Sequence, residues 1–337
     1  MTVKTPRKSV IILMPRPGSH KIANQCVVEY WRKHLRIITN PFFIWLLTPF
    51  WEDRVLSYDV TDYQHAPNIV NRYVTIQKEW GNRPPILSLT ENDRERGWDL
   101  LKTLGVSDDA WFVCLHARES GFKPNPYADR YRNVDINSYI PTMKAIVEHG
   151  GWCVRMGDPT MKPIPQIERV VDYVHLSIRS DWMDVFLSAS CRFFLGCESG
   201  LNFIPEIFGV PNATSNRCPM SNVLQYGNKD ISIPKLVWSL KEERYLMFKE
   251  VLDSPIGHFP PIHSFSEAGV QVIDNSPEEI RALALEMLAQ TEGTLKYTNE
   301  DEVLQNRFKS LMNPTHFSYG ALSRVGRDFL RKYEYLL

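Results

Sequence analysis

The sequence has no cysteine pair of the Cys-x-x-Cys kind, and its six cysteines are scattered along 337 residues. This spacing indicates neither a zinc-binding motif nor a disulfide framework. We interpret the cysteines as buried free thiols in a reducing cytoplasm. The basic residues near the start are followed by an apolar run, residues 10–14, that is too short for the core of a secretory signal, so we expect a cytoplasmic protein.

Long hydrophobic runs are also lacking. The most apolar stretch, residues 41–51, is interrupted by prolines and is far shorter than the ~20 residues that a membrane-spanning helix needs. Its aromatic side chains could still dip into a membrane surface, although packing in a core or between domains explains them equally well. The sequence therefore predicts no membrane-spanning segment here.

The chain has no net charge, because 39 basic residues balance 39 acidic ones. This balance excludes a protein that coats nucleic acid, so we expect no nucleic-acid partner. The first forty residues are nevertheless basic, with Glu29 as their one acid. Their basic residues are Lys4, Arg7, Lys8, Arg16, Lys21, Arg32, Lys33 and Arg36. Such a region suits peripheral association with an anionic membrane surface at its inner face, although charges on solvated helix faces explain it equally well.

A glycine-rich dinucleotide motif is missing from the first predicted strand–helix connection, residues 15–20, so no nicotinamide or flavin site is supported there. Short apolar runs followed by helical patterns recur at residues 9–14, 110–116, 152–156 and 193–195. Alternating strands and helices predict an α/β fold with doubly wound parallel sheets. After Pro211 the chain is rich in loop-forming residues.

The length suits two domains. We place an N-terminal Rossmann-like domain at residues 1–90, with the tail, residues 300–337, packing back on it. A C-terminal Rossmann-like domain occupies residues 91–299. A stretch with Gly81 and two prolines, residues 80–85, reads as the hinge before it.

The segment from Cys191 to Pro211 is the most informative one. Residues 193–195 predict a buried strand, residues 196–200 a tight loop, and residues 201–208 a helix that ends at Gly209. A helix start after such a loop offers backbone N–H groups to an anion. An ordinary strand–helix connection, with glycines only for the turn, explains the segment equally well.

Three loops follow predicted strands: residues 116–118, residues 155–158 and residues 196–200. Because the carboxyl ends of parallel strands face one side, these loops should converge on one crevice. The guanidinium of Arg118 and the free N–H groups of the third loop would suit a pyrophosphate. A salt bridge to a local acid is the alternative for Arg118, and an ion pair across the turn is the alternative for Arg155 and Asp158.

Two of these motifs resemble known glycosyltransferases. His116-Ala117-Arg118 resembles the His-x-Arg motif of GT-B fucosyltransferases, whose arginine binds the nucleotide diphosphate. Residues 193–211 resemble the Gly-x-x-Ser-Gly loop and helix of heptosyltransferases. Residues 113–211 as a whole, and residues 272–288, look like a bacterial surface-polysaccharide glycosyltransferase. The resemblance implies a GT-B fold, with two Rossmann-like domains that face a cleft. It further implies that residues 1–90 lie on the acceptor side and that residues 91–299 bind the nucleotide sugar.

The resemblance further implies transfer of a hexosyl or deoxyhexosyl group from a GDP- or UDP-sugar to a glycan or lipid-linked acceptor in surface-polysaccharide biosynthesis. The donor is a co-substrate, and we expect no metal ion and no other cofactor; the sequence agrees, because it lacks an Asp-x-Asp motif. Glu119 stands where a second basic residue often follows the fucosyltransferase motif, so GDP-fucose is one candidate donor among several. A sugar-nucleotide epimerase, a pyruvyl-type transferase and a non-catalytic nucleotide-sugar-binding module remain alternatives.

The candidate site residues follow from the motifs and the resemblance together. The predicted donor-binding residues are His116, Arg118, Arg155, Gly157, Asp158, Glu198, Ser199 and Gly200. The predicted catalytic residues are His20, Arg118 and Glu119. His20 would act as general base from across the cleft, with His116, Glu119 and Asp158 as rivals.

Overall fold

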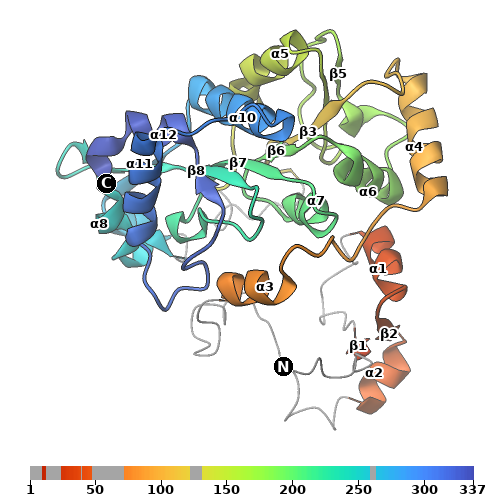
Figure 1. The fold of residues 1–337 in the computed structure, drawn as a ribbon, viewed down its shortest axis with the longest axis horizontal. Helices are drawn as coiled ribbons and strands as arrows, with labels where there is room; N and C mark the ends of the chain where they lie inside the picture. Colours follow the sequence, from red (N-terminus) through yellow and green to blue (C-terminus); the bar gives the residue numbers. More distant parts are fainter. Residues whose placement is uncertain (1–9, 13–23, 39, 48–71, 122–130, 259–262) are drawn as a thin grey trace. The chain divides into compact units, whose positions relative to one another are not determined.

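The structure is a computed structural model that describes residues 10–12, 24–38, 40–47, 72–121, 131–258 and 263–337 (Figure 1). The chain divides into two compact units, residues 1–68 and 69–337. Each unit is treated by itself below.

The smaller unit begins with a parallel strand pair. Strand β1 (Val10–Ile12) pairs with β2 (Arg36–Ile38), and helix α1 (Gln25–Arg32) lies between them in the chain. Asn24 caps α1, because its side-chain oxygen accepts a hydrogen bond of 3.1 Å from the Val27 N–H. Helix α2 (Pro41–Leu47) follows. The predicted strand–helix–strand start is therefore present.

The larger unit is built on a seven-stranded sheet in the order β12-β8-β7-β6-β3-β4-β5, and every neighbouring pair is parallel. The strands are β3 (Phe112–His116), β4 (Trp152–Arg155), β5 (Val170–Val171), β6 (Phe194–Gly196), β7 (Asn212–Arg217), β8 (Ile231–Pro234) and β12 (Arg324–Val325). The chain starts at β3, moves outward to β5, and returns to β6 on the other side of β3. This is the doubly wound order, and it agrees with the predicted α/β, GT-B-like fold class.

Helices cover both faces of this sheet (Figure 1). One face carries α5 (Ile140–Glu148) and α10 (Pro277–Glu292), and the other carries α6 (Asp181–Ser190) and α7 (Phe203–Ile207). Helix α4 (Glu91–Thr103) packs beside α6, and helix α3 (Arg72–Trp80) precedes it in the chain. A smaller antiparallel sheet has the order β10-β9-β11. Its strands are β9 (Leu236–Ser239), β10 (Arg244–Tyr245) and β11 (Val270–Ile273), with α8 (Phe248–Leu252) and α9 (His263–Glu267) between β10 and β11 in the chain.

Local signals in the sequence account for the ends of the longest helix. Ser276 begins α10 with a capping box, in which its hydroxyl accepts from the Glu279 N–H and the Glu279 carboxylate accepts from the Ser276 N–H. Pro277 occupies the first helical position, and Gly293 ends the helix with φ 73°. Both ends of the helix are therefore set by local sequence signals.

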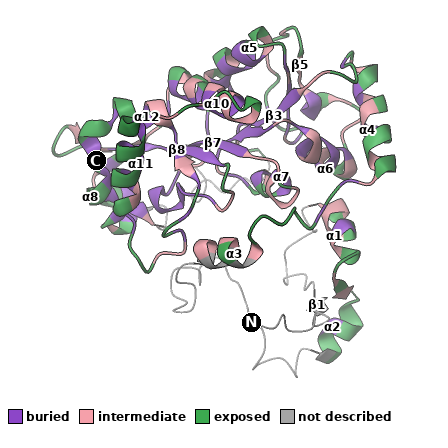
Figure 2. Ribbon diagram, in the orientation of Figure 1, coloured by how far each residue is buried: buried purple, intermediate pink, exposed green. Residues whose placement is uncertain are grey.

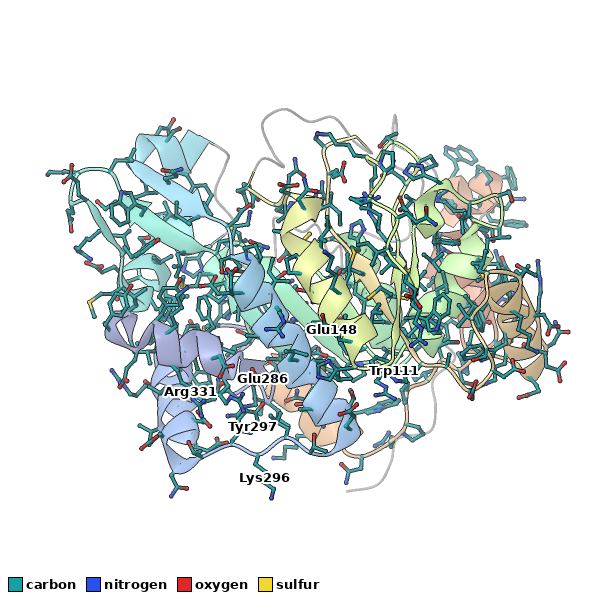
Figure 3. The ribbon with its side chains drawn as sticks, turned by 90° about the horizontal axis from the view of Figure 1, so that it is seen from above. Trp111, Glu148, Glu286, Lys296, Tyr297 and Arg331 are labelled. Carbon is teal, nitrogen blue, oxygen red and sulfur yellow. The ribbon has the colours of Figure 1, made fainter. Side chains whose placement is uncertain are left out.

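The tail belongs to the larger unit. Strand β12 is an edge strand of the seven-stranded sheet, and the Phe317 carbonyl accepts a hydrogen bond of 3.2 Å from the Tyr73 N–H. The packing of residues 300–337 on an N-terminal domain of residues 1–90 stays a prediction. Helix α11 (Asn299–Ser310) and helix α12 (Arg327–Lys332) pack together. Buried Glu286 of α10 accepts hydrogen bonds from the Tyr297 hydroxyl at 2.9 Å and the Arg327 N–H at 2.7 Å (Figure 3). These bonds fix the tail to α10.

The core lies around the central strands. All five residues of β3 are buried, as are β6 and most of β7 (Figure 2). Burying each large apolar side chain contributes about 1.5–3 kcal/mol, which explains why the apolar runs predicted these strands. Five of the cysteines are buried and all six are free, as expected. Among the described residues, no helix is long and apolar enough to cross a membrane.

Strand β7 is a central strand that the sequence did not reveal, because its residues Asn212–Arg217 are mostly polar. The side chains of Ser215 and Asn216 have specific partners, whereas the Asn212 side-chain oxygen and the Thr214 hydroxyl have none among the described residues. The Ser215 hydroxyl lies 2.8 Å from the Tyr139 hydroxyl and 3.2 Å from the carbonyl of Gly196. Asn216 and Asn275 exchange two hydrogen bonds between side chain and backbone. Buried polar groups with partners are tolerated in a core, so the strand forms without an apolar pattern.

Candidate functional site

The order of the sheet reverses between β3 and β6. In open α/β sheets, ligands bind in the crevice outside the carboxyl ends of the strands at such a point. Here His116, the last residue of β3, is paired with Gly196, the last residue of β6. The loop that carries Arg118 and the loop of residues 196–200 therefore leave the sheet side by side. The third loop that the sequence singled out leaves the same edge, because Leu115 of β3 is paired with Arg155, the last residue of β4.

Cys197 joins these two loops. Its N–H donates to the carbonyl of His116 at 3.3 Å, and its sulfur accepts from the N–H of Arg118 at 3.1 Å. The carbonyl of Arg118 in turn accepts from the Val134 N–H at 3.0 Å. Burial raises the pKa of the Cys197 thiol to about 11, so the sulfur is a neutral acceptor. The backbone of Arg118 is thereby held against Cys197, which lies two residues before Ser199 in the chain. Sequence reasoning missed this contact.

Gly196 has to be glycine because the two loops approach closely. A Cβ atom there would lie 2.9 Å from the Phe194 ring, 3.0 Å from the Asn202 side-chain oxygen and 3.3 Å from the His116 carbonyl oxygen. At Gly200 a Cβ atom would meet no heavy atom within 4 Å. Packing therefore explains the first glycine of the loop and does not explain the second.

The helix after this loop is shorter than predicted. Residues 201–208 divide into a 3-10 turn, Gly200–Asn202, and the five residues of α7. Ser199 is buried and caps the turn, because its hydroxyl oxygen accepts from the Leu201 N–H at 3.3 Å and its proton points to the Asn202 side-chain oxygen at 3.2 Å. A short helix gives a weaker dipole than the one expected. Any anion binding here would rest mainly on individual N–H groups and on guanidinium groups.

Glu198 is engaged by a cation that the sequence analysis overlooked. Its carboxylate lies 2.8 Å from the guanidinium of Arg217, and both side chains are largely buried. Arg217 is the last residue of β7, and its guanidinium also donates to the carbonyl of Asn222 at 2.5 and 3.0 Å. An arginine at the end of a buried strand is a signal for such a site. The sequence analysis missed Arg217 because the polar sequence of β7 does not predict a strand.

Arg155 lies inside a buried ion-pair network. Its guanidinium donates to Glu119 at 2.9 Å, to Asp172 at 3.0 Å and to the carbonyl of Lys162 at 2.6 Å, and its side chain is fully buried. The other carboxylate oxygen of Glu119 accepts from the Lys162 N–H at 3.1 Å. The alternative that we weighed, a pair between Arg155 and Asp158, is therefore replaced by pairs with Glu119 and Asp172. These contacts explain Arg155 and Glu119 structurally, and their roles in donor binding or catalysis stay predictions.

The loop after β4 is a tight turn. Asp158 accepts hydrogen bonds from the N–H of Thr160, at 2.9 Å, and from its hydroxyl. Gly157 has φ 150°, and a side chain there would overlap the Met161 sulfur. The carbonyl of Gly157 accepts from the guanidinium of Arg179 at 3.1 Å. Arg179 was not predicted, and it adds a further guanidinium, besides those of Arg118, Arg155 and Arg217, near the carboxyl ends of the strands.

His116 is a neutral imidazole at physiological pH. Burial, with the nearby charges of Arg118 and Arg155 as further contributions, lowers its pKa to about 4. Its Nδ1 lies 3.1 Å from the carbonyl oxygen of Met156 and must donate to it, which leaves Nε2 as an acceptor. The ring therefore ties the end of β3 to the loop after β4. An imidazole with so low a pKa is a weak base.

One residue of the predicted site lies outside the described residues, because His20 belongs to residues 13–23. The role of His20 as general base therefore stays a prediction. Among the described residues, no group of three or more histidine, cysteine, aspartate or glutamate side chains could hold a metal ion.

Comparisons with known proteins add little to this geometry. No protein-family model matches the chain, and no curated protein matches it. Among solved structures, the chain is similar to the crystal structure of the glycosyl transferase family 9 from Veillonella parvula, with 13% sequence identity and a TM-score of 0.33. The match covers 48% of this chain and 47% of that one, so it spans about half of each. A likeness this weak carries no argument about the reaction, which has to be inferred from the residues themselves.

Proposed function

We propose that this protein is a glycosyltransferase that moves a sugar from a GDP- or UDP-linked donor to a hydroxyl of a glycan or lipid-linked acceptor in surface-polysaccharide biosynthesis. The observation that carries the proposal is the crevice where the sheet order reverses. There, the loop with Arg118 and the loop of residues 196–200 start from paired residues and are joined through Cys197. Crevices of this kind bind nucleotides in other doubly wound sheets.

The charges around this crevice suit a diphosphate. Arg118 follows β3, Arg217 ends β7, and Arg179 contacts the loop after β4. In glycosyl transfer, the bond between the sugar and the diphosphate breaks while the acceptor oxygen bonds to the sugar, and negative charge grows on the leaving diphosphate. A guanidinium fork and fixed N–H groups stabilise that charge because they need no reorganisation during the reaction. We assign this role to Arg118 and to the amides of residues 198–200.

The acceptor hydroxyl must lose a proton to a general base. His116 has a lowered pKa, Glu119 is paired with Arg155, and Asp158 accepts two hydrogen bonds from Thr160. The lowered pKa and these hydrogen bonds make His116, Glu119 and Asp158 less suitable as the general base than His20. We therefore keep His20 as the proposed base.

Thermal-shift measurements with GDP, UDP, CMP and TDP test the proposal on wild type and on Arg118→Ala. At a ligand concentration of about 100 Kd, a nucleotide that binds the folded state adds about 2.7 kcal/mol of stability. We expect one nucleotide to raise the melting temperature of wild type and not that of Arg118→Ala, whose own melting temperature stays close to the wild-type value. Arg307→Ala, at an exposed ion pair on α11, is the matched control and should respond like wild type.

Turnover assays distinguish the alternatives. Sugar transfer that requires an acceptor supports the proposal, whereas conversion of the nucleotide sugar without an acceptor would indicate an epimerase. Turnover with an enolpyruvate donor would indicate a pyruvyl-type transferase. Nucleotide-sugar binding without any turnover would indicate a binding module, and equal nucleotide affinity in wild type and Arg118→Ala would refute the role of Arg118.

A further inference from the structure

A cavity in the larger unit shares no lining residue with the three loops of the candidate donor site. It has a volume of about 300 Å³. Three segments form it: a 3-10 turn after β7 (Met220–Asn222), the end of α8 with the following 3-10 turn (Pro255–Gly257), and the connection between α11 and β12. Ligand pockets in proteins run from about 300 to 1,000 Å³, so this one has room for about one ring-sized molecule.

Hydrogen bonds define what the two histidines of the cavity offer. Nε2 of His258 lies 3.0 Å from the carbonyl oxygen of Leu252 and must donate to it, which leaves Nδ1 as an acceptor. Nδ1 of His316 accepts from the Ser318 N–H at 3.3 Å, so its Nε2 carries the proton and is a donor. Their ring centroids are 6.2 Å apart. Burial first, and then the neighbouring His258, lowers the pKa of His316 to about 4, so that ring is neutral at pH 7.

Ser221 supplies a hydroxyl group. Its residue is 3% exposed and lines the cavity. A hydroxyl group can donate one hydrogen bond and accept others. A ligand with hydroxyl groups of its own can therefore bond to it from the cavity.

The remaining lining decides the charge and shape of the ligand. Asp253 contributes a carboxylate, which is paired with the ammonium group of Lys249 at 2.6 Å. No lysine or arginine is among the described residues that line the cavity, so the lining itself offers an anionic ligand no cation. Leu252, Leu311 and Met312 contribute apolar surface on which the C–H groups of a ring can pack.

We propose that this cavity binds an uncharged, hydroxyl-rich ring, such as a single pyranose unit of a glycan. The lining offers an imidazole donor, an imidazole acceptor, a hydroxyl and a carboxylate, from His316, His258, Ser221 and Asp253. This set matches a molecule whose hydroxyl groups both donate and accept hydrogen bonds. The site does not depend on nucleotide binding, because it lies outside the donor loops. If the proposed transfer reaction holds, the cavity adds a glycan-binding site to the same domain.

Saturation-transfer NMR and calorimetry on the full chain test this proposal, with the methyl glycosides of glucose, galactose and mannose as probes. We expect at least one to bind wild type and Arg118→Ala equally, and glucose 1-phosphate to bind the cavity more weakly because it is anionic. Ser221→Val should weaken binding about five- to tenfold, the effect of one lost hydrogen bond. The serine control Ser310→Val, at an exposed position on α11, should bind like wild type.

His316 supplies a second test that does not rely on Ser221. His316→Phe should lose binding about as much as Ser221→Val, while His316→Gln, which keeps an N–H donor, should recover most of it. Three outcomes would overturn the proposal. They are no binding of any glycoside to wild type, equal binding in folded Ser221→Val and His316→Phe, and displacement of the glycoside by the nucleotide that binds the donor site.

Discussion

Replacing Arg155 by methionine tests whether the buried arginine holds the site together or contacts the donor. Methionine keeps an apolar side chain of similar reach and removes the guanidinium, so Glu119 and Asp172 lose their cation. Breaking a buried pair by removing one partner costs about 3–5 kcal/mol. Glu119 and Asp172 retain 17% and 22% of their exposure, so water can solvate them in part and we expect the lower end of this range.

For a unit of this size, about 1 kcal/mol corresponds to roughly 2–4 °C in melting temperature. Arg155→Met should therefore melt about 6–12 °C below wild type. The control Arg307→Met breaks an exposed pair with Glu334 and should cost less than about 1 kcal/mol. Adding Glu119→Gln to Arg155→Met should recover part of the loss, because one of the stranded carboxylates is removed.

Chemical unfolding followed by circular dichroism measures these stabilities, and nucleotide titration of each folded variant measures binding. If Arg155→Met unfolds like wild type and yet loses its nucleotide affinity, the structural role that we assign to Arg155 is refuted. The arginine would then contact the donor, as the sequence first suggested.

Three further predictions concern other parts of the molecule. Gly196→Ala should destabilise the fold by about 1–3 kcal/mol and weaken nucleotide binding, whereas Gly200→Ala should leave stability nearly unchanged. Melting curves of the two variants measure the difference, and equal stability would contradict the prediction. Burial raises the pKa of Glu286 from 4.5 to about 7, so ionising this carboxyl lowers the free energy of unfolding as pH rises between these values. In urea unfolding at pH 4 and pH 8, Glu286→Gln should lose roughly 3 kcal/mol less stability than wild type over this range. The same pH dependence in both proteins would refute the prediction. Phe42 and Trp45 of α2 are 60% and 70% exposed. If the N-terminal region binds membranes, changing both residues to serine should reduce co-sedimentation with anionic vesicles at least tenfold. Unchanged co-sedimentation would count against membrane binding.

The apolar pattern of the sequence predicted much of the central sheet. The runs before His116 and Gly196 gave β3 and β6, and parallel strands with helices on both faces followed from their alternation. Because carboxyl ends of parallel strands share one edge, the convergence of the Arg118 loop and the 196–200 loop could be inferred without coordinates. Capping signals such as Ser276 fixed helix ends for the same local reason.

What escaped prediction depends on contacts between distant residues. The partners of Arg155 are 36 and 17 residues away in the chain, and charge alone could not choose them over Asp158. Strand β7 has no apolar pattern, and some of its polar groups, such as the Ser215 hydroxyl, have partners on other elements that the sequence does not reveal. Arg217, at the end of this strand, was missed for the same reason. The sulfur bond between Cys197 and Arg118 likewise exists only in three dimensions.

A crystal structure of the protein with the nucleoside diphosphate that gives the largest thermal shift tests the central claim most directly. We predict that the diphosphate lies at the carboxyl ends of β3 and β6, with its oxygens within hydrogen-bond distance of the Arg118 guanidinium and of at least one backbone N–H of residues 198–200. A diphosphate bound elsewhere on the molecule, with neither group in contact, would contradict the proposed donor site and the transfer reaction built on it.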